Sequence, residues 1–431
     1  MCYTLIGFTK RENIMRDILI TLIVVIGCLY TLKKAYIGVL LWSWLSYMNP
    51  HRLAYGFAYN MPFAQITALV LLLSMIFSKE KQAIPINSLT FIWGCFIVWM
   101  GITTLLAYYP DAAYIQFKKV IKIQLMTVLT MILIDNMTKL RQLIWVIVLS
   151  ISYYSVKGGV FTLLTGGTYR VWGPPGSFIE DNNTLAVAVL MVIALMMYLY
   201  QTAEKKWVKN ALIFMVIFSL FTVLGSQSRG ALLAIIAVGG FYWLKSKSKV
   251  YSGIFIAIAA VALLSFMPDS WYERMHTIEN YEEDGSAMGR INAWKYAFNA
   301  ANDNFFGVGF DSWSPETFLL YAPVPEDVHA AHSIYFSVLA DHGWPGLIMF
   351  LLILFMSWQK LSKIIKKTKN DDSFKEYEIL AKMLQIAFIS YIVGGAFLSI
   401  SYFDLPWHLV CFVLLLEQFV KRETIDDTAK I

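Results

Sequence analysis

Residues 185–200, LAVAVLMVIALMMYLY, form an apolar run that contains no charged side chain. Its length approaches the roughly 20 residues that an α-helix needs to cross a bilayer. Similar runs recur along the 431 residues, of which 58% are hydrophobic and 15% charged, and the mean hydropathy is +0.59. A soluble globule of this size could not bury so much apolar surface. The sequence therefore predicts an all-α polytopic membrane protein, because a helix satisfies its own backbone polar groups in lipid.

The other apolar runs set the expected number of spans. Together with the first run, the expected spans are residues 62–77, 89–106, 120–134, 143–164, 185–200, 211–224, 231–244, 254–266, 334–356, 379–398 and 409–420. Lys33 and Lys34 divide residues 17–48 into two short pieces, so the total is 12 or 13. Met15 precedes a clean apolar run and is an alternative start.

These spans divide the chain into five parts. We expect an N-terminal tail at residues 1–16, a transmembrane region at 17–267, a large loop at 268–331, C-terminal transmembrane helices at 332–420 and a tail at 421–431.

Basic side chains occupy every second connection between the expected spans. They are Lys79, Lys81, Lys139, Arg141, Lys205, Lys206, Lys209, Lys245, Lys247, Lys249, Lys360, Lys363, Lys366, Lys367 and Lys369. By the positive-inside rule these connections are cytoplasmic, so the alternate ones, 108–116, 165–182, 226–230, 268–331 and 401–407, face outward. Topology thus explains the net charge of +6, and no nucleic-acid partner is expected.

The connection at 268–331 is too long for a turn and is strongly acidic. Loops of this length without an internal fold are usually functional. Met288, Ile291, Trp294 and Phe298 recur at helical spacing from a start near Ser286, which predicts an amphipathic helix on the membrane surface. Arg290 lies four residues before Trp294, so the two side chains share a face of that helix.

Three outward residues could bind an anion or accept a proton: Arg229, Arg290 and His332. Each also has an ordinary explanation. Arg229, in Ser-Gln-Ser-Arg-Gly, could snorkel from a helix end. Arg290 could pair with a neighbouring loop carboxylate, Glu282 or Glu283, and His332 could be a structural hydrogen-bond partner.

A metal site is not expected. His329 and His332 are three residues apart, which is a possible spacing for two ligands on a helix, but no Glu or Cys lies at a supporting spacing. The four cysteines, Cys2, Cys28, Cys95 and Cys411, are widely spaced, and three of them lie in apolar runs. They indicate neither a disulfide framework nor a metal knuckle.

Four motifs in the second half of the chain resemble the signature region of the O-antigen ligase and polymerase superfamily. They are residues 289–294 (GRINAW), 307–310 (GVGF), 329–335 (HAAHSIY) and 341–346 (DHGWPG), and residues 228–230 (SRG) resemble its upstream arginine motif. Residues 46–53 (SYMNPHRL) and 178–183 (FIEDNN) are more specifically similar to the exosortase A-associated O-glycosylation ligases.

The resemblance implies a membrane glycosyltransferase at the periplasmic face of the bacterial inner membrane. Such an enzyme transfers a preassembled glycan from an undecaprenyl-diphosphate carrier to a hydroxyl of a lipid, glycan or protein, without a metal or other cofactor. The superfamily's two arginines fall on Arg229 and Arg290, and its base falls on His332. The 268–331 loop would bind the donor and close as a lid over it.

The residue types suit this chemistry. Guanidinium forks bind phosphate oxygens bidentately, and a neutral imidazole can take the proton of an acceptor hydroxyl. Direct displacement would invert the anomeric centre. Further candidates for substrate binding are Trp294, Tyr169, Arg170, Glu180, Asp181 and His329.

Two alternatives remain open at this stage. A polysaccharide polymerase of the same superfamily would use the growing chain as its acceptor. A polysaccharide transporter or flippase is the third reading, although such proteins are expected to carry intramembrane charges or internal repeats around a central site. Neither feature stands out in the sequence.

Overall fold

The computed structural model describes residues 10–78, 81–245, 248–276 and 285–428, and these residues contain helices and no strand. The helices are α1 (Lys10–Lys33), α2 (Ala35–Met48), η1 (Pro50–Leu53), η2 (Phe57–Asn60), α3 (Phe63–Phe77), α4 (Ser88–Leu105), α5 (Pro110–Leu133), α6 (Met137–Leu164), α7 (Asn182–Thr202), α8 (Lys206–Gly225), α9 (Arg229–Lys245), α10 (Lys249–Leu264), α11 (Asp269–His276), α12 (Gly285–Asp303), α13 (Pro315–Tyr321), α14 (Ile334–Thr368), η3 (Asp372–Phe374), α15 (Lys375–Gly395) and α16 (Asp404–Thr428).

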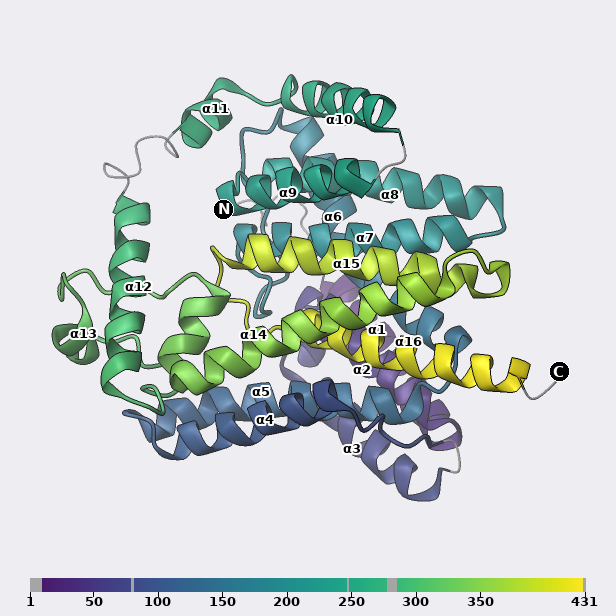
Figure 1. Ribbon diagram of the computed structural model, residues 1–431, viewed down its shortest axis with the longest axis horizontal. Coiled ribbons are helices and arrows are strands. Elements are labelled where there is room, and N and C mark those ends of the chain that lie inside the picture. The colour runs from purple at the N-terminus through teal and green to yellow at the C-terminus, as the bar shows by residue number, and fades with distance from the viewer. Residues whose placement is uncertain (1–9, 79–80, 246–247, 277–284, 429–431) are drawn as a thin grey trace.

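The long helices run side by side as a bundle (Figure 1). Among the described residues, seven helical segments are long and apolar enough to cross a membrane: Ile14–Lys33, Ser88–Leu105, Met137–Leu164, Asn182–Thr202, Lys206–Gly225, Ile334–Thr368 and Asp372–Gly395. Three shorter apolar helices accompany them, α2, α3 and α10. The chain is therefore an all-α polytopic membrane protein with about seven candidate spans by this measure.

Helix α7 lies at the centre of the bundle, between α6, α8, α9 and α15. Its side chains from Leu185 to Val189 are fully buried, so this part of the apolar run at residues 185–200 belongs to the core and not to a lipid-facing surface. Small residues permit close packing around it. A Cβ atom at Gly159 of α6 would collide with the Phe218 carbonyl of α8, as expected for helix contacts in lipid, where small residues let backbones approach.

Two helix boundaries differ from the expectation at the chain ends. Helix α1 already begins at Lys10 and supplies a full-length candidate span from Ile14, so its piece of the 17–48 segment is not short. Helix α16 continues to Thr428, beyond the expected end of the last span at residue 420. In both cases the helix continues into charged residues. Hydropathy does not assign these residues to a span, but lysine, arginine and glutamate have high helix propensities.

Helix α12 crosses one end of the bundle at a steep angle to the long helices (Figure 1). The predicted helix near Ser286 is thus present, and it buries a face other than the one predicted to lie on the membrane surface. Ala293, Tyr296, Ala297 and Ala300 are fully buried against α13 and α14. Met288 and Phe298 are exposed, and their contact with the membrane surface stays a prediction.

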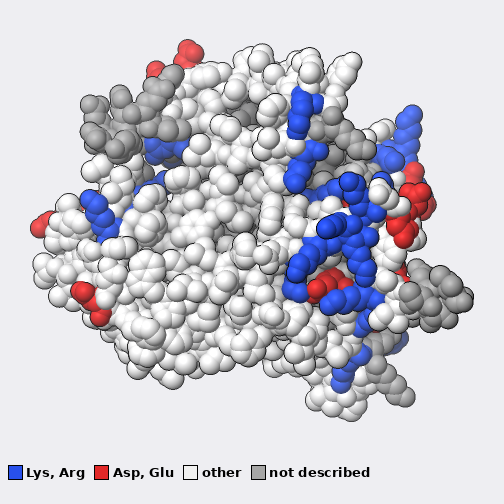
Figure 2. Space-filling view, viewed as in Figure 1, with Lys and Arg blue, Asp and Glu red and all other residues white. Residues whose placement is uncertain are grey.

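The two ends of the bundle carry different cations. The lysine-rich end, defined by Lys139, Lys205, Lys245 and Lys366, contains the turn between α14 and α15. Figure 2 shows basic side chains gathered towards that end, around a small group of acidic ones. The arginine end, defined by Arg52, Arg170, Arg229 and Arg290, is the end that α12 crosses.

Candidate active site

Arg229 is the first residue of α9, directly after a tight turn that ends α8. Gln227 within the turn has a left-handed backbone with φ of 55°. The turn is tied to the 165–182 loop, because Gln227 Nε2 donates to the Gly167 carbonyl at 3.2 Å and Asn182 Nδ2 donates to the Ser226 carbonyl at 2.6 Å. The Arg229 side chain is half-buried, and these contacts fix the backbone from which it extends.

Arg290 lies in the second turn of α12 and is also half-buried. Its neighbour Gly289 faces His329 so closely that a Cβ atom would collide with the imidazole ring. One turn later, Trp294 Nε1 donates to the Ala331 carbonyl at 2.7 Å, immediately before His332. Helix α12 is therefore fastened along the segment that carries both histidines.

Aromatic rings connect Trp294 to the start of α9. The Trp294 ring stacks on Phe336 with centroids 5.0 Å apart and lies 6.5 Å from Phe397. Phe397 in turn packs against α9, since a Cβ atom at Gly230 would lie 3.2 Å from it. Phe397 thus lies next to both Gly230, which follows Arg229, and Trp294, which lies four residues after Arg290.

His332 adopts a left-handed backbone with φ of 43°, which is uncommon for a residue with a side chain. Such strain is concentrated at functional sites. Its side chain is exposed, so its dehydration is partial. Even so, the surrounding protein, followed by the nearby Arg290 guanidinium, lowers the pKa of His332 from its ordinary value. Asp181 raises that pKa and His329 lowers it further, so all three residues act on the His332 imidazole.

The other predicted site residues have mostly local partners. Asp181 is the N-cap of α7 and accepts from the Asn183 and Thr184 amides at 2.9 and 3.3 Å. Glu180 Oε2 accepts from the Gly176 amide at 2.7 Å, and His329 Nε2 pairs with Asp327 Oδ1 at 2.7 Å.

Tyr169 and Arg170 are exposed on the 165–182 loop. Arg170 Nε donates to Gln227 Oε1 at 3.4 Å, whereas Tyr169 packs near Phe161 with ring centroids 6.4 Å apart. Arg170 therefore reaches the Arg229 turn, and Tyr169 stays at the margin. The possible partners of Arg290 at residues 282 and 283 lie outside the described residues.

Residues 214–351 match the O-antigen ligase family. Residues 15–204 match a family of unknown function (DUF5935). No protein with a curated description matches the chain. A match to the ligase family implies a membrane enzyme of the glycosyltransferase type that acts on lipid-linked glycans.

The two matched regions meet at the site. Arg229, Arg290 and His332 lie in the ligase match, whereas Asp181 and Arg170 come from the region of unknown function. Where the structure describes the chain, no three His, Cys, Asp or Glu side chains are grouped as a metal site would require.

Two features of the site had only weak sequence signals. Phe397 was one of many aromatics near a span end, and nothing indicated that it would join α9 to α12. Arg52 stacks over Tyr59 at 4.5 Å, and its Nε lies 3.9 Å from the position of a Cβ atom at Gly176. Only the similarity of residues 46–53 to the ligase motif could have suggested that Arg52 approaches this loop.

Proposed function

We propose that this protein transfers a preassembled glycan from an undecaprenyl-diphosphate carrier to an acceptor hydroxyl at the periplasmic face of the bacterial inner membrane. The single observation that carries this proposal is the influence of Arg290 and Asp181 on the His332 imidazole, at the end of the bundle where Arg229 begins α9. This influence supports a site in which a guanidinium group lies near a base, within a region that matches O-antigen ligases, and we assign Arg229 to the same site.

In the proposed reaction the acceptor oxygen attacks the anomeric carbon and inverts it. The bond from that carbon to the diphosphate oxygen breaks, and its electron pair leaves with the carrier diphosphate. Arg229 and Arg290 bind the phosphate oxygens and stabilise the charge that develops there. His332 takes the hydroxyl proton, and its lowered pKa keeps the imidazole neutral and able to do so.

The other candidates have supporting roles in this proposal. Trp294 and Arg170 contact the donor beside the two arginines, and Tyr169, Glu180 and His329 contact sugar at the margin. Asp181 acts on His332 through its charge. No metal ion or cofactor takes part.

We further propose that the 268–331 segment is the donor-binding lid. Its far end is anchored to the connection between α4 and α5, since Tyr108 and Tyr321 hydroxyls are 2.7 Å apart and Tyr109 and Ser314 hydroxyls 2.8 Å apart. A lid movement would pivot about this anchor and displace the start of α12, which carries Arg290.

The topology that accompanies this function is 13 spans, α1–α10 and α14–α16. It is supported by the gathering of lysines at one end of the bundle, which the positive-inside rule makes cytoplasmic. The arginine end then faces the periplasm. Similarity of residues 46–53 and 178–183 to the exosortase A-associated O-glycosylation ligases favours O-glycosylation as the reaction of this enzyme.

A polymerase of the same superfamily remains the second candidate. A flippase is the third and least favoured candidate. The test is reconstitution with an undecaprenyl-diphosphate glycan and separate lipid, glycan and protein acceptors, read by mass spectrometry. A single glycan addition supports the ligase, repeated additions the polymerase, and the absence of any covalent product would contradict both.

A further inference from the structure

A hollow lies at the lysine-rich end, far along the bundle from the candidate active site. It has a volume of about 280 Å³ and opens between α6, α7 and α8. Its walls are formed by Arg141, Trp145, Leu199, Thr202, Ala203, Glu204, Lys205 and Val208. None of these residues takes part in the proposed glycan transfer.

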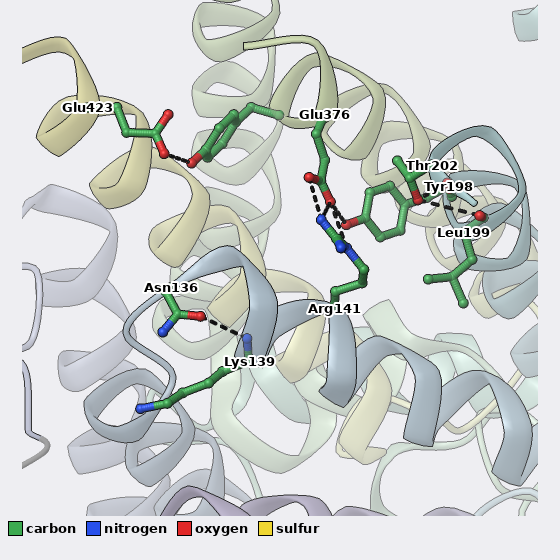
Figure 3. Close-up of polar contacts among 9 residues, drawn as sticks. Asn136, Lys139, Arg141, Tyr198, Leu199, Thr202, Glu376 and Glu423 are labelled. Atoms are coloured by element: carbon green, nitrogen blue, oxygen red, sulfur yellow. Dashed lines mark hydrogen bonds and ion pairs between the residues drawn. The ribbon is translucent and has the colours of Figure 1, made fainter. Parts of the chain in front are cut away.

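Arg141 is held in a fixed orientation beside this hollow. Its Nε and Nη2 donate to Glu376 Oε1 at 2.9 and 2.6 Å, and Nη2 also reaches Oε2 at 2.6 Å. Tyr198 donates to the same carboxylate at 2.6 Å, and Figure 3 shows the three side chains converging from α6, α7 and α15. The Arg141 side chain is nevertheless 40% exposed, so it still presents part of its guanidinium to the hollow.

Lys205 supplies the second cation. It is exposed in the connection between α7 and α8, and makes no ion pair among the described residues. Glu204 is the one acid among the lining residues, against Arg141 and Lys205. Since Glu376 already pairs with Arg141, the attraction for an anion comes mostly from Lys205, and Glu204 in the same lining reduces it.

The hollow is also apolar on one side. Leu199 is buried, and Trp145 and Val208 are half-buried, so these side chains form a wall towards the middle of the bundle. Tryptophan at the end of a span is typical of the headgroup level of a membrane. A ligand that fits both parts has a phosphate next to an apolar body.

We infer that this hollow binds the headgroup of an anionic phospholipid, with its phosphate between Arg141 and Lys205 and its glycerol and upper acyl carbons against Trp145 and Val208. The lipid would join α6, α7 and α8, and through Glu376 also α15, at the end of the bundle opposite the site. This inference does not depend on the proposed glycan transfer.

The test measures lipid binding and not activity. The purified full-length protein is placed in nanodiscs of phosphatidylcholine with increasing phosphatidylglycerol, and bound phosphatidylglycerol is counted by native mass spectrometry. We expect a saturable site, and Lys205→Gln should weaken it about fivefold, the effect of about 1 kcal/mol for one cation at an anionic surface. Lys206→Gln is the matched control, because Lys206 is also exposed and adjacent but does not line the hollow.

Three outcomes would overturn the inference. One is the absence of any preference for phosphatidylglycerol over phosphatidylcholine. Another is an equal loss of binding in both variants, which would mean that the lysine-rich surface attracts lipid without a site. The third is Lys205-dependent saturation by inorganic phosphate in discs of phosphatidylcholine alone, which would make soluble phosphate the ligand.

Discussion

The two ends of the bundle both carry cations, but they hold them in different ways. At the lysine-rich end several cations have carboxylate partners in regular helices, such as Lys360 with Glu417 at 2.6 Å and Lys382 with Glu378 at 2.6 Å. At the arginine end the cations flank turns with left-handed backbone, at Gln227 and at His332. Asn370, in the turn between α14 and α15 at the lysine-rich end, is also left-handed, but asparagine adopts this backbone more readily than glutamine does. The left-handed backbone at Gln227 and His332 suggests a surface shaped for a substrate, whereas lysines at the ends of helices suit topology and lipid contact.

The largest predicted effect comes from the histidine at the arginine end. His332→Asn should lower transfer by about 10²- to 10⁴-fold, the usual loss for a general base, with membrane abundance unchanged. Asparagine is chosen because it also tolerates a left-handed backbone. His329→Ala should retain most activity. Near-normal turnover of the His332 variant in the reconstituted assay would remove this residue from the mechanism.

Replacement of arginine by lysine at the arginine end should have a larger effect than replacement of lysine by arginine at the lysine-rich end. Arg229→Lys and Arg290→Lys should each lower turnover by about 10- to 100-fold, because lysine keeps the charge but loses a bidentate contact of about 1.5–3 kcal/mol. Lys363→Arg, on the exposed surface of the lysine-rich end, should change nothing.

The double variant of the two arginines tests whether they act together. If both bind one diphosphate, their losses should be less than additive, since contacts within one network couple. Strictly additive losses in donor binding and turnover would show that Arg229 and Arg290 serve separate surfaces.

A smaller effect concerns the pH dependence of kcat/KM. His332 acts as a base only when neutral, so activity should be lost as pH falls through its lowered pKa. Arg290→Gln removes a cation that lowers this pKa, and the acidic limb should move to higher pH. Asp181→Asn removes an acid that raises it, and the limb should move to lower pH. Asparagine also caps helices well, so α7 should be preserved. Shifts in the same direction for both variants would contradict this assignment.

The smallest expected effect is that of a chelator. Transfer should continue at an undiminished rate in excess EDTA, because guanidinium groups take the role that a divalent cation has in many phosphate-transfer sites. Loss of activity that one divalent ion restores would replace this mechanism by a metal-dependent one.

Local sequence determined the helical class and the candidate cations. Apolar runs such as residues 185–200 need only their own composition to predict a helix in lipid, and α7 confirms it. The choice of Arg229, Arg290 and His332 rested equally on residue type and on motifs. Their roles stay predictions, but naming them as candidates required no knowledge of tertiary contacts.

Only the tertiary structure decided which faces are buried and which side chains meet. Helix α12 buries Ala293 and Tyr296 against α13 and α14 and leaves Met288 and Phe298 exposed, because the space left by those partners selects the face. Likewise Asp181 acts on His332 across more than 150 positions of sequence, and Arg141 meets Glu376 from another helix. Hydropathy and periodicity describe each helix alone, whereas these contacts depend on how separate helices pack.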